Sequence, residues 1–189
     1  MIQTNSTSIE RIKQGDIISD VEYIEYIDVE NGVIKASKIN FPLVIVLTQD
    51  CDLTWDYDSR TNGTGNQDKY LFSVIVAPLY NYEHFIAGEH LSELGQKMQT
   101  ISPKPDKTDN KNLRNNETPR YHYLEFDETV PIVNSVIDFK HYFTVSVTRL
   151  QQHKKGHYIC SVSELFRERI SQRFANYLSR IGLPEISHA

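Results

Sequence analysis

The chain has 189 residues and a formal net charge of −5. This length suits one domain, 1–189, that buries enough surface to fold without a metal or a disulfide. The acidic balance excludes a dedicated, sequence-independent DNA-coating protein, which would be basic overall. Two cysteines without a CxxC motif indicate a reducing compartment, and no segment has the ~20 apolar residues of a membrane span. We therefore expect a soluble, cytoplasmic protein that does not enter a membrane.

Short β-rich segments dominate the first part of the chain. Residues 15–18 predict a turn followed by a short strand. The Asn-Gly pair at 31–32 lies between the β-rich runs 23–29 and 32–37, and it predicts a hairpin because both residues tolerate positive φ. The run 43–47 is aliphatic and largely β-branched, which predicts a strand buried on both faces.

The middle of the chain alternates between polar and apolar segments. Residues 54–69 are polar and contain glycine, which predicts a loop, and 70–79 predict a second strand buried on both faces and ended by Pro78. We interpret 81–118 as an insertion with a weak helical pattern in its first half. Its last part, 103–118, is rich in Lys, Asp, Asn and Thr, so we expect this part to be mobile.

The last third predicts three strands and one helix. The strands are expected at 120–126, 135–139 and 143–148. A Ser161–Glu164 capping box begins a C-terminal helix that we expect over 161–182. The apolar stripe of this helix consists of Phe166, Ile170, Phe174, Tyr177 and Ile181, widened by Leu165 and Leu178.

The order of these segments predicts an α+β fold that is mainly β. We expect a small SH3-like β-barrel formed by 12–80 and 119–150. The inserted segment 81–118 would be partly helical and partly disordered, and the amphipathic helix 161–182 would close the chain.

The tripeptide Asp50-Cys51-Asp52 directly follows the buried strand 43–47. On an extended chain Asp50 and Asp52 face the same way, and paired carboxylates can bind a divalent ion or raise one another's pKa. Two aspartates that cap a turn are the structural alternative. Cys51 faces the opposite side, where it is either a small buried residue or a nucleophile that needs a base.

Arg120 and His122 lie on the predicted strand 120–126 and are the other candidate catalytic residues. Arg120 can stabilise phosphate charge through its planar donors, or it can pair on the surface with Glu117 or Glu125. His122 is the best candidate base for Cys51, although a packing histidine is the simpler interpretation.

Basic residues on the C-terminal helix are candidates for nucleic-acid binding. Arg169, Arg173 and Arg180 are four and seven residues apart, close to one helical face, and the alternative is the solvated side of an amphipathic helix. We find neither zinc motif nor phosphate-binding glycine loop, and His141, His153 and His157 lack the spacing of a helical metal site. We expect no metal and no cofactor.

The order of the segments resembles the PemK/MazF (CcdB-like) toxin fold, an SH3-like barrel with a C-terminal helix. The opening Gly-Asp-Ile/Val strand of that family is similar to 15–18, and its Pro-containing apolar strand is similar to 41–47. Its Val-Ile-Val-Ala-Pro strand is similar to 73–78, and its strand ending in Arg-Leu is similar to 135–150. The resemblance covers roughly half of the chain, and its weight comes from the shared order of individually weak motifs.

The resemblance implies a bacterial toxin or defence protein that binds or cleaves RNA, in the latter case as a metal-independent endoribonuclease. It also implies an antitoxin or other protein partner and a homodimer. Asn40-Phe41 and Leu79-Tyr80 stand where the family has its catalytic arginine and threonine. A cleft of this kind would therefore be rebuilt from other residues: Asp50, Cys51, Asp52, Arg120 and His122.

A second hypothesis belongs to a different functional class. The chain would be a non-catalytic barrel that acts as a protein–protein interaction module, with the polar insertion 81–118 ordering on contact with its partner. The acidic net charge favours this hypothesis, whereas the polar tripeptide at the strand end favours the first. The sequence leaves open whether the protein is an enzyme.

Overall fold

The computed structural model describes residues 2–5, 10–63, 66–102 and 104–180. Its strands form one antiparallel sheet, in which seven strands follow a continuous path and an eighth pairs beside it. Along the path the strands are β1 (Thr4–Asn5), β8 (Tyr158–Val162), β2 (Asp16–Glu30), β3 (Val33–Val46), β4 (Ser73–Asn81), β6 (Ser135–Asp138) and β5 (Tyr121–Leu124). The eighth strand, β7 (Phe143–Ser146), pairs with the first half of β4.

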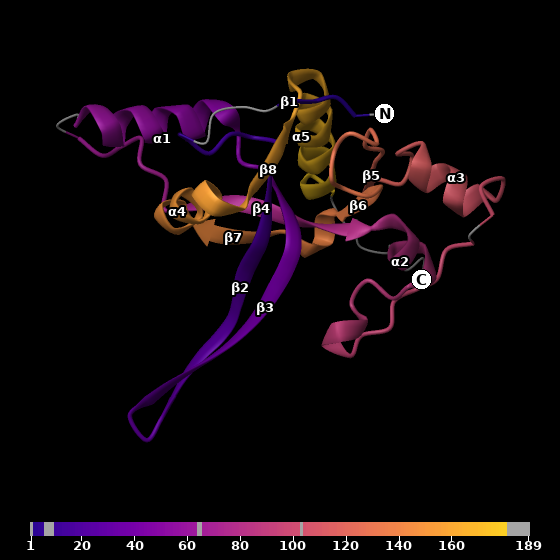
Figure 1. Cartoon of the computed structure of the whole chain (residues 1–189), viewed down its shortest axis with the longest axis horizontal. Coiled ribbons are helices and arrows are strands. Elements are labelled where there is room, and N and C mark those ends of the chain that lie inside the picture. Colours follow the sequence, from indigo (N-terminus) through magenta and orange to yellow (C-terminus); the bar gives the residue numbers. More distant parts are fainter. Residues whose placement is uncertain (1, 6–9, 64–65, 103, 181–189) are drawn as a thin grey trace, which may run out of the picture.

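Helices flank both sides of the sheet and stand over one end of it (Figure 1). The α-helices are α1 (Asp50–Asn62), α2 (Tyr82–Ala87), α3 (Thr108–Arg114), α4 (Val147–His157) and α5 (Glu164–Leu178), and the 3₁₀ turns are η1 (Ser92–Leu94) and η2 (Phe139–His141). The α+β class is therefore confirmed. No helix among the described residues has both the length and the apolar character to cross a bilayer.

The sheet is open, so the predicted closed barrel is wrong. Its two ends are the short strands β1 and β5. Across the gap between them, the described residues form a single isolated bridge, Ile2–Phe126, in which the Ile2 amide donates to the Glu125 carbonyl at 2.6 Å. Closure of a barrel needs a continuous ladder between the end strands, and terminal strands of two and four residues are too short to form one.

The predicted hairpin is confirmed and is much longer than expected. Asn31 and Gly32 have φ values of 52° and 76°, as a two-residue hairpin turn requires. Only the first three residues of β2, 16–18, pair with β8, and only the last three residues of β3, 44–46, pair with β4. The outer parts of the two strands therefore pair only with each other, and they project from the body as a two-stranded ribbon (Figure 1). We call residues 22–40 the arm.

The prediction of strands buried on both faces is also confirmed. Ile45 packs into one core cluster, whereas its neighbours Val44 and Val46 pack into a second cluster on the other side of the sheet. In β4, Ala77 packs into the first cluster and Val76 into the second. β4 continues past Pro78 to Asn81, because at this residue the strand changes partner from β3 to β6.

Several predicted boundaries near helices are wrong. The expected loop 54–69 is helical up to Asn62, and the chain turns into α4 at Val147, inside the predicted strand 143–148. Ser161 lies in β8 and donates to Asp16, so it does not cap α5, which begins at Glu164.

The C-terminal helix itself is confirmed, but its buried face is narrower than predicted. Ile170, Phe174 and Tyr177 are buried, whereas Leu165 and Leu178 are exposed. The helix ends at Leu178, and the last part of the predicted range, 181–182, lies outside the described residues.

The insertion is partly helical, as predicted, and it packs on the body. It contains α2, η1 and α3, and residues 108–114 are helical where a mobile run was expected. Leu113 is 1% exposed and joins a third hydrophobic cluster with Tyr80, Phe85 and Tyr123. The Asn110 side chain accepts a hydrogen bond from Tyr82 and donates to the Ser102 carbonyl, which ties α3 to the preceding loop.

Candidate functional site

A cavity of about 240 Å³ lies between the insertion and the end of the sheet formed by β5 and β6. We call it the insertion cavity. Phe85 and Tyr121 supply aromatic walls. The polar and charged lining consists of His90, Gln99, Thr100, Asp109, Asn112, Thr118, Arg120 and Asp138. Of the predicted catalytic residues, only Arg120 lines this cavity.

Arg120 and Asp138 form a two-pronged ion pair in the cavity wall. Arg120 Nε donates to Asp138 Oδ1 at 2.8 Å, and Nη2 donates to Oδ2 at 2.5 Å. In the register of β5 and β6, Tyr121 lies directly opposite Asp138. Arg120 is the residue before Tyr121, so its side chain can reach Asp138 across the two strands. Asp138 is fully buried, and hydrogen bonding to Asp138 raises the pKa of Arg120. The predicted surface pairing of Arg120 with Glu117 or Glu125 is therefore wrong.

A histidine and a tyrosine extend this polar cluster. The hydroxyl of Tyr80 lies 3.0 Å from His141 Nδ1, which itself lies 3.6 Å from Asp138 Oδ2. Burial lowers the pKa of His141, outweighing the opposite effect of Asp138. Burial also raises the pKa of Tyr80. Both side chains are therefore neutral near pH 7.

His90 is the most unusual side chain of the cavity. Its ring stacks on Phe85 at 4.4 Å and lies 4.7 Å from the ring of Tyr80. Burial, followed by the nearby His141, lowers the pKa of His90 to about 4. Both ring nitrogens are buried without a standard hydrogen bond to any described residue. An interaction with the His84 backbone acts on this pKa in the opposite direction, and because both nitrogens are buried His90 contributes its ring surface to the cavity.

The insertion cavity therefore combines aromatic surface with hydrogen-bonding groups that carry little net charge. Asp138 neutralises Arg120 and His90 is neutral at pH 7, so the exposed Asp109 is the remaining charged group of the lining. Such a lining suits a small planar, uncharged group that hydrogen-bonds along its edge and stacks on an aromatic ring. It does not provide a cation free to bind phosphate, nor a histidine protonated at pH 7 to act as an acid.

Asp50 lies elsewhere, in the first turn of α1 rather than at the end of a strand. Arg11 donates to both of its carboxylate oxygens, at 3.1 and 3.0 Å, and the backbone amide of Gln14 donates to Oδ1 at 3.2 Å. Burial raises the pKa of Asp50, but the hydrogen bonds and charge of Arg11 outweigh it, so the pKa is lowered overall. The carboxylate joins the N-terminal segment to α1.

Cys51 and Asp52 follow in the same helical turn. The prediction that the two aspartates face one way rested on an extended backbone, and it is wrong because successive helical side chains point about 100° apart. Cys51 is exposed, and its Sγ donates to Asp52 Oδ1 at 3.8 Å. Neither residue lines the insertion cavity.

His122 lies on the opposite side of β5 from Tyr121 and is 3% exposed. Its ring packs near Phe139, at 6.2 Å between centroids, and does not line the insertion cavity. Burial, followed by Arg173 and Arg169, lowers its pKa to about 3. The packing interpretation of His122 fits this position better than a base for the exposed Cys51. The five proposed catalytic residues are therefore not gathered in one described cavity.

The three arginines of the predicted basic stripe on α5 have different environments. Arg173 is half-buried, and its Nη2 donates to the carbonyls of Thr118 and Tyr121, both at 2.8 Å. Arg180 lies over the ring of Tyr177 at 3.5 Å, and Arg169 is exposed. Only part of this stripe is free to contact nucleic acid.

The spacing of two histidines on α4 differs from the sequence prediction. His153 and His157 are one helical turn apart, which is the spacing of a helical metal pair, and their rings stack at 3.9 Å. They contact Ser19 and Asp20. Within the described ranges, no group of three or more potential ligands is arranged to hold a metal ion.

The sequence interpretation missed most of the cavity. Asp138 was a visible signal, because it is the only charged residue in the predicted strand 135–139 and a buried carboxylate needs a partner. His90, Tyr80 and His141 had no comparable signal, since they meet only after the insertion folds against β4 and η2.

No protein-family model matches the chain, and no curated protein matches it. The resemblance to PemK/MazF toxins therefore stays a prediction that rests on the order of the segments alone.

Proposed function

We propose that the protein binds single-stranded RNA and holds an unstacked base in the insertion cavity. Sequence-specific RNA recognition generally stacks a base on an aromatic ring and reads its edge with hydrogen bonds. Tyr121 and Phe85 provide the aromatic surface, and Gln99, Asn112 and Thr118 in the same lining provide hydrogen-bond donors and acceptors. The aromatic wall and the hydrogen-bonding side chains of one cavity are the observation that carries the proposal.

The charge around the cavity supports the same proposal, although the whole chain is acidic. Residues 97–120 contain six basic and three acidic side chains. The basic ones are Lys97, Lys104, Lys107, Lys111, Arg114 and Arg120, and the acidic ones are Asp106, Asp109 and Glu117. None of these lysines lines the cavity itself, and from the segment around it they would contact the phosphates on either side of the base.

The proposal is binding without cleavage. Metal-independent cleavage of a phosphodiester needs a base, an acid and a cation on the phosphate. His90 and His141 are neutral at pH 7, and Arg120 is already paired with Asp138. The acid and the free cation are therefore missing from the cavity lining.

The test is a titration of fluorescently labelled single-stranded RNA, followed by anisotropy. We expect wild-type protein to bind and Tyr121→Ala to bind about 5- to 150-fold more weakly, because stacking of one base contributes about 1–3 kcal/mol. Tyr121→Phe keeps the ring and should bind nearly as well as wild type. RNA recovered after incubation, with and without EDTA, should be intact.

A matched pair of lysine variants tests the phosphate contacts. Lys111 is exposed on α3, which contributes Asp109, Asn112 and Leu113 to the cavity lining. Lys155 is exposed on α4, a helix that lies on the opposite side of the molecule from α3 (Figure 1). Lys111→Ala should weaken binding and reduce its dependence on salt, whereas Lys155→Ala should change neither. Equal effects of the two variants, or equal binding by wild type and Tyr121→Ala, would contradict the proposal.

An interaction module without RNA binding is the second candidate, and the arm favours it. Ile27, Val29 and Ile34 are 60%, 64% and 72% exposed. Apolar side chains grouped on one projecting element are typical of a protein-binding surface. The same titration separates the two candidates, because an interaction module of this kind would leave the anisotropy of the RNA unchanged.

A further inference from the structure

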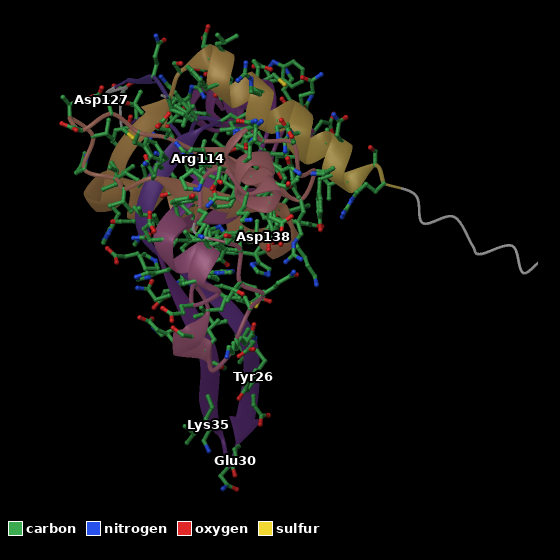
Figure 2. All side chains as sticks on the ribbon, turned by 90° about the vertical axis from the view of Figure 1, so that its right-hand side faces the viewer. Tyr26, Glu30, Lys35, Arg114, Asp127 and Asp138 are labelled. Carbon is green, nitrogen blue, oxygen red and sulfur yellow. The ribbon has the colours of Figure 1, made fainter. Side chains whose placement is uncertain are left out.

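The sheet splits at the point where β4 changes its partner. β3 pairs with β4 only over 44–46, and beyond Pro78 β4 pairs with β6 on its opposite edge. From the split, β3 runs away from β4 into the arm, whose outer residues Tyr26, Glu30 and Lys35 lie beyond every other element (Figure 2). Among the described residues, the last part of β4 therefore has a strand on one edge and none on the other.

The hydrogen-bond pattern shows which backbone groups of β4 face this open edge. The Ile75 carbonyl accepts from Leu47, on the side of β3, whereas the amide of Tyr82 donates on the side of β6. The backbone groups of successive strand residues point to alternate edges, so the N–H and C=O of Leu79 and the N–H of Asn81 face the open edge. Within the described residues, no backbone group bonds to them there. Such an edge is a template for a further strand.

A groove of about 350 Å³ lies beside this edge, and we call it the split groove. Its volume is within the roughly 300–1,000 Å³ of ligand sites. The walls are residues 39–43 of β3, 78–81 of β4 and 89–94 of the segment that follows α2. Leu79 packs into the first hydrophobic cluster and Tyr80 into the third, because successive strand residues point to opposite faces. The split groove therefore reaches both faces of the sheet, as the space of a missing strand does.

The lining of the split groove is apolar with an acidic rim. Leu94 and Val133 are 39% and 59% exposed at its edge. Glu89 and Glu93 are exposed and have no ion-pair partner among the described residues. Neither lysine nor arginine occurs in the described lining. This charge attracts a cationic group and repels phosphate, so the groove suits a basic, partly apolar peptide and disfavours nucleic acid.

We propose that the split groove binds a short extended peptide of a partner protein, in which apolar side chains lie between lysines or arginines. The peptide adds to β4 as a strand and pairs with the backbone of Leu79 and Asn81. Its apolar side chains contact the groove walls, and its cations reach Glu89 and Glu93. In this binding mode the main chain supplies affinity and the side chains supply specificity. The proposal is independent of RNA binding, because the linings of the split groove and the insertion cavity share only His90.

The experiment is an NMR titration of the ¹⁵N-labelled full chain, without RNA, with the acetylated and amidated peptide Lys-Val-Leu-Val-Lys. We expect the amide signals of Leu79 and Asn81 to shift to lower field until they saturate, because both N–H groups gain an acceptor. Two peptides serve as control probes. Glu-Val-Leu-Val-Glu meets like charges, and Lys-Val-Leu-Val-Lys with N-methylated central amides cannot donate as a strand does. Each should bind about 10-fold or more weakly.

Matched protein variants test the acidic rim. Glu89→Gln/Glu93→Gln removes both charges at nearly constant size and should weaken binding roughly 2- to 30-fold, as expected for two exposed charge pairs. Glu83→Gln changes an exposed carboxylate of α2 outside the lining and should bind like wild type. Absence of shifts at Leu79 and Asn81, or equal binding of the N-methylated peptide, would overturn strand addition. Equal binding of the acidic peptide would overturn the assigned chemistry of the partner.

Discussion

Two arginine–aspartate pairs of the same chemistry lie in different parts of the molecule. Arg11 holds Asp50 at the start of α1, and Arg120 holds Asp138 at the end of β6. In both pairs the arginine donates to both carboxylate oxygens. Asp50 has a 21% exposed side chain and no described cavity beside it, whereas Asp138 has a 1% exposed side chain and lines the insertion cavity.

The difference lies in the surroundings of each pair rather than in the pair itself. The remaining partners of Asp50 are Gln14 and Arg167, so its bonds fix the packing of neighbouring segments. The Asp138 pair lines a cavity together with aromatic side chains and the polar side chains Gln99, Asn112 and Thr118. A carboxylate that follows a buried strand is therefore a weak indicator of a functional site, and a cavity lined by aromatic and hydrogen-bonding side chains is a stronger one.

The largest effect is expected from removal of the buried carboxylate. Asp138→Ala leaves Arg120 without its partner and removes the acceptor of the Lys140 amide. Breaking a buried pair costs about 3–5 kcal/mol, and we expect the lower end because the Arg120 side chain is 30% exposed. Urea unfolding measures the change, and a loss below about 1 kcal/mol would contradict the assigned role.

The paired variant Arg120→Met provides the control for this experiment. It leaves Asp138 buried without a counter-charge, so it should destabilise the protein at least as much as Asp138→Ala. The double variant Arg120→Met/Asp138→Ala should be more stable than the sum of the two single effects predicts, since it removes both charges. Simple additivity would show that the two residues are not coupled.

Acid should destabilise the protein through its buried histidines. The unfolded chain protonates a histidine near pH 6.5, whereas folded His122 takes up a proton only near pH 3. Its contribution to stability is therefore complete above pH 6.5 and is lost as the pH falls toward 3. Between pH 7 and 5 this single histidine should cost about 2 kcal/mol of unfolding free energy.

The variant His122→Gln isolates this effect, because glutamine does not titrate. Unfolding free energies of the variant and of wild type, measured at pH 7 and pH 5, should show a smaller loss in the variant. His90 and His141 have lowered pKa values as well, so part of the acid sensitivity will remain. Equal losses in variant and wild type would exclude a buried neutral His122.

The Asp50 pair should contribute less than the Asp138 pair. Asp50→Asn keeps the size of the side chain and removes its charge, and we expect a loss of about 1 kcal/mol at pH 7 because both partners are partly exposed. The lowered pKa of Asp50 means that its contribution is present above pH 3.8 and is lost as the pH falls below it. RNA affinity should be unchanged, and a weaker affinity would place Asp50 in the functional site.

The parts of the fold that the sequence predicted are those with a strong local pattern. Val44, Ile45 and Val46 alternate between two cores, and Asn31-Gly32 turns the hairpin, as local rules require. The sheet edges, by contrast, depend on the lengths of β1 and β5, and no local signal fixes whether such short strands meet. The barrel prediction failed at this point.

The missed helices depend on contacts between distant segments. α1 has no side-chain cap at Gln49, and it is held in place by the buried Asp56, which accepts from Arg60 and from the Leu71 amide. α4 buries Lys154, which donates to Asp16 at 2.7 Å across 138 residues of sequence. The Asp56–Arg60 pair is a local i,i+4 pair that the sequence shows. The contacts of Asp56 with Leu71 and of Lys154 with Asp16 exist only after folding, so periodicity alone predicted a loop and a strand there.

The smallest effect is expected at Cys51, and it gives the sharpest contrast with the catalytic hypothesis. The thiol is exposed and has a single weak partner, Asp52, so Cys51→Ser should change the unfolding free energy by less than about 0.5 kcal/mol. RNA affinity should match that of wild type, because Cys51 does not line the insertion cavity. A nucleophile would behave differently: treatment of wild type with a thiol-alkylating reagent, or the serine substitution, would then abolish activity on RNA. Unchanged binding after both treatments would leave the insertion cavity as the functional region and the tripeptide as the start of a helix.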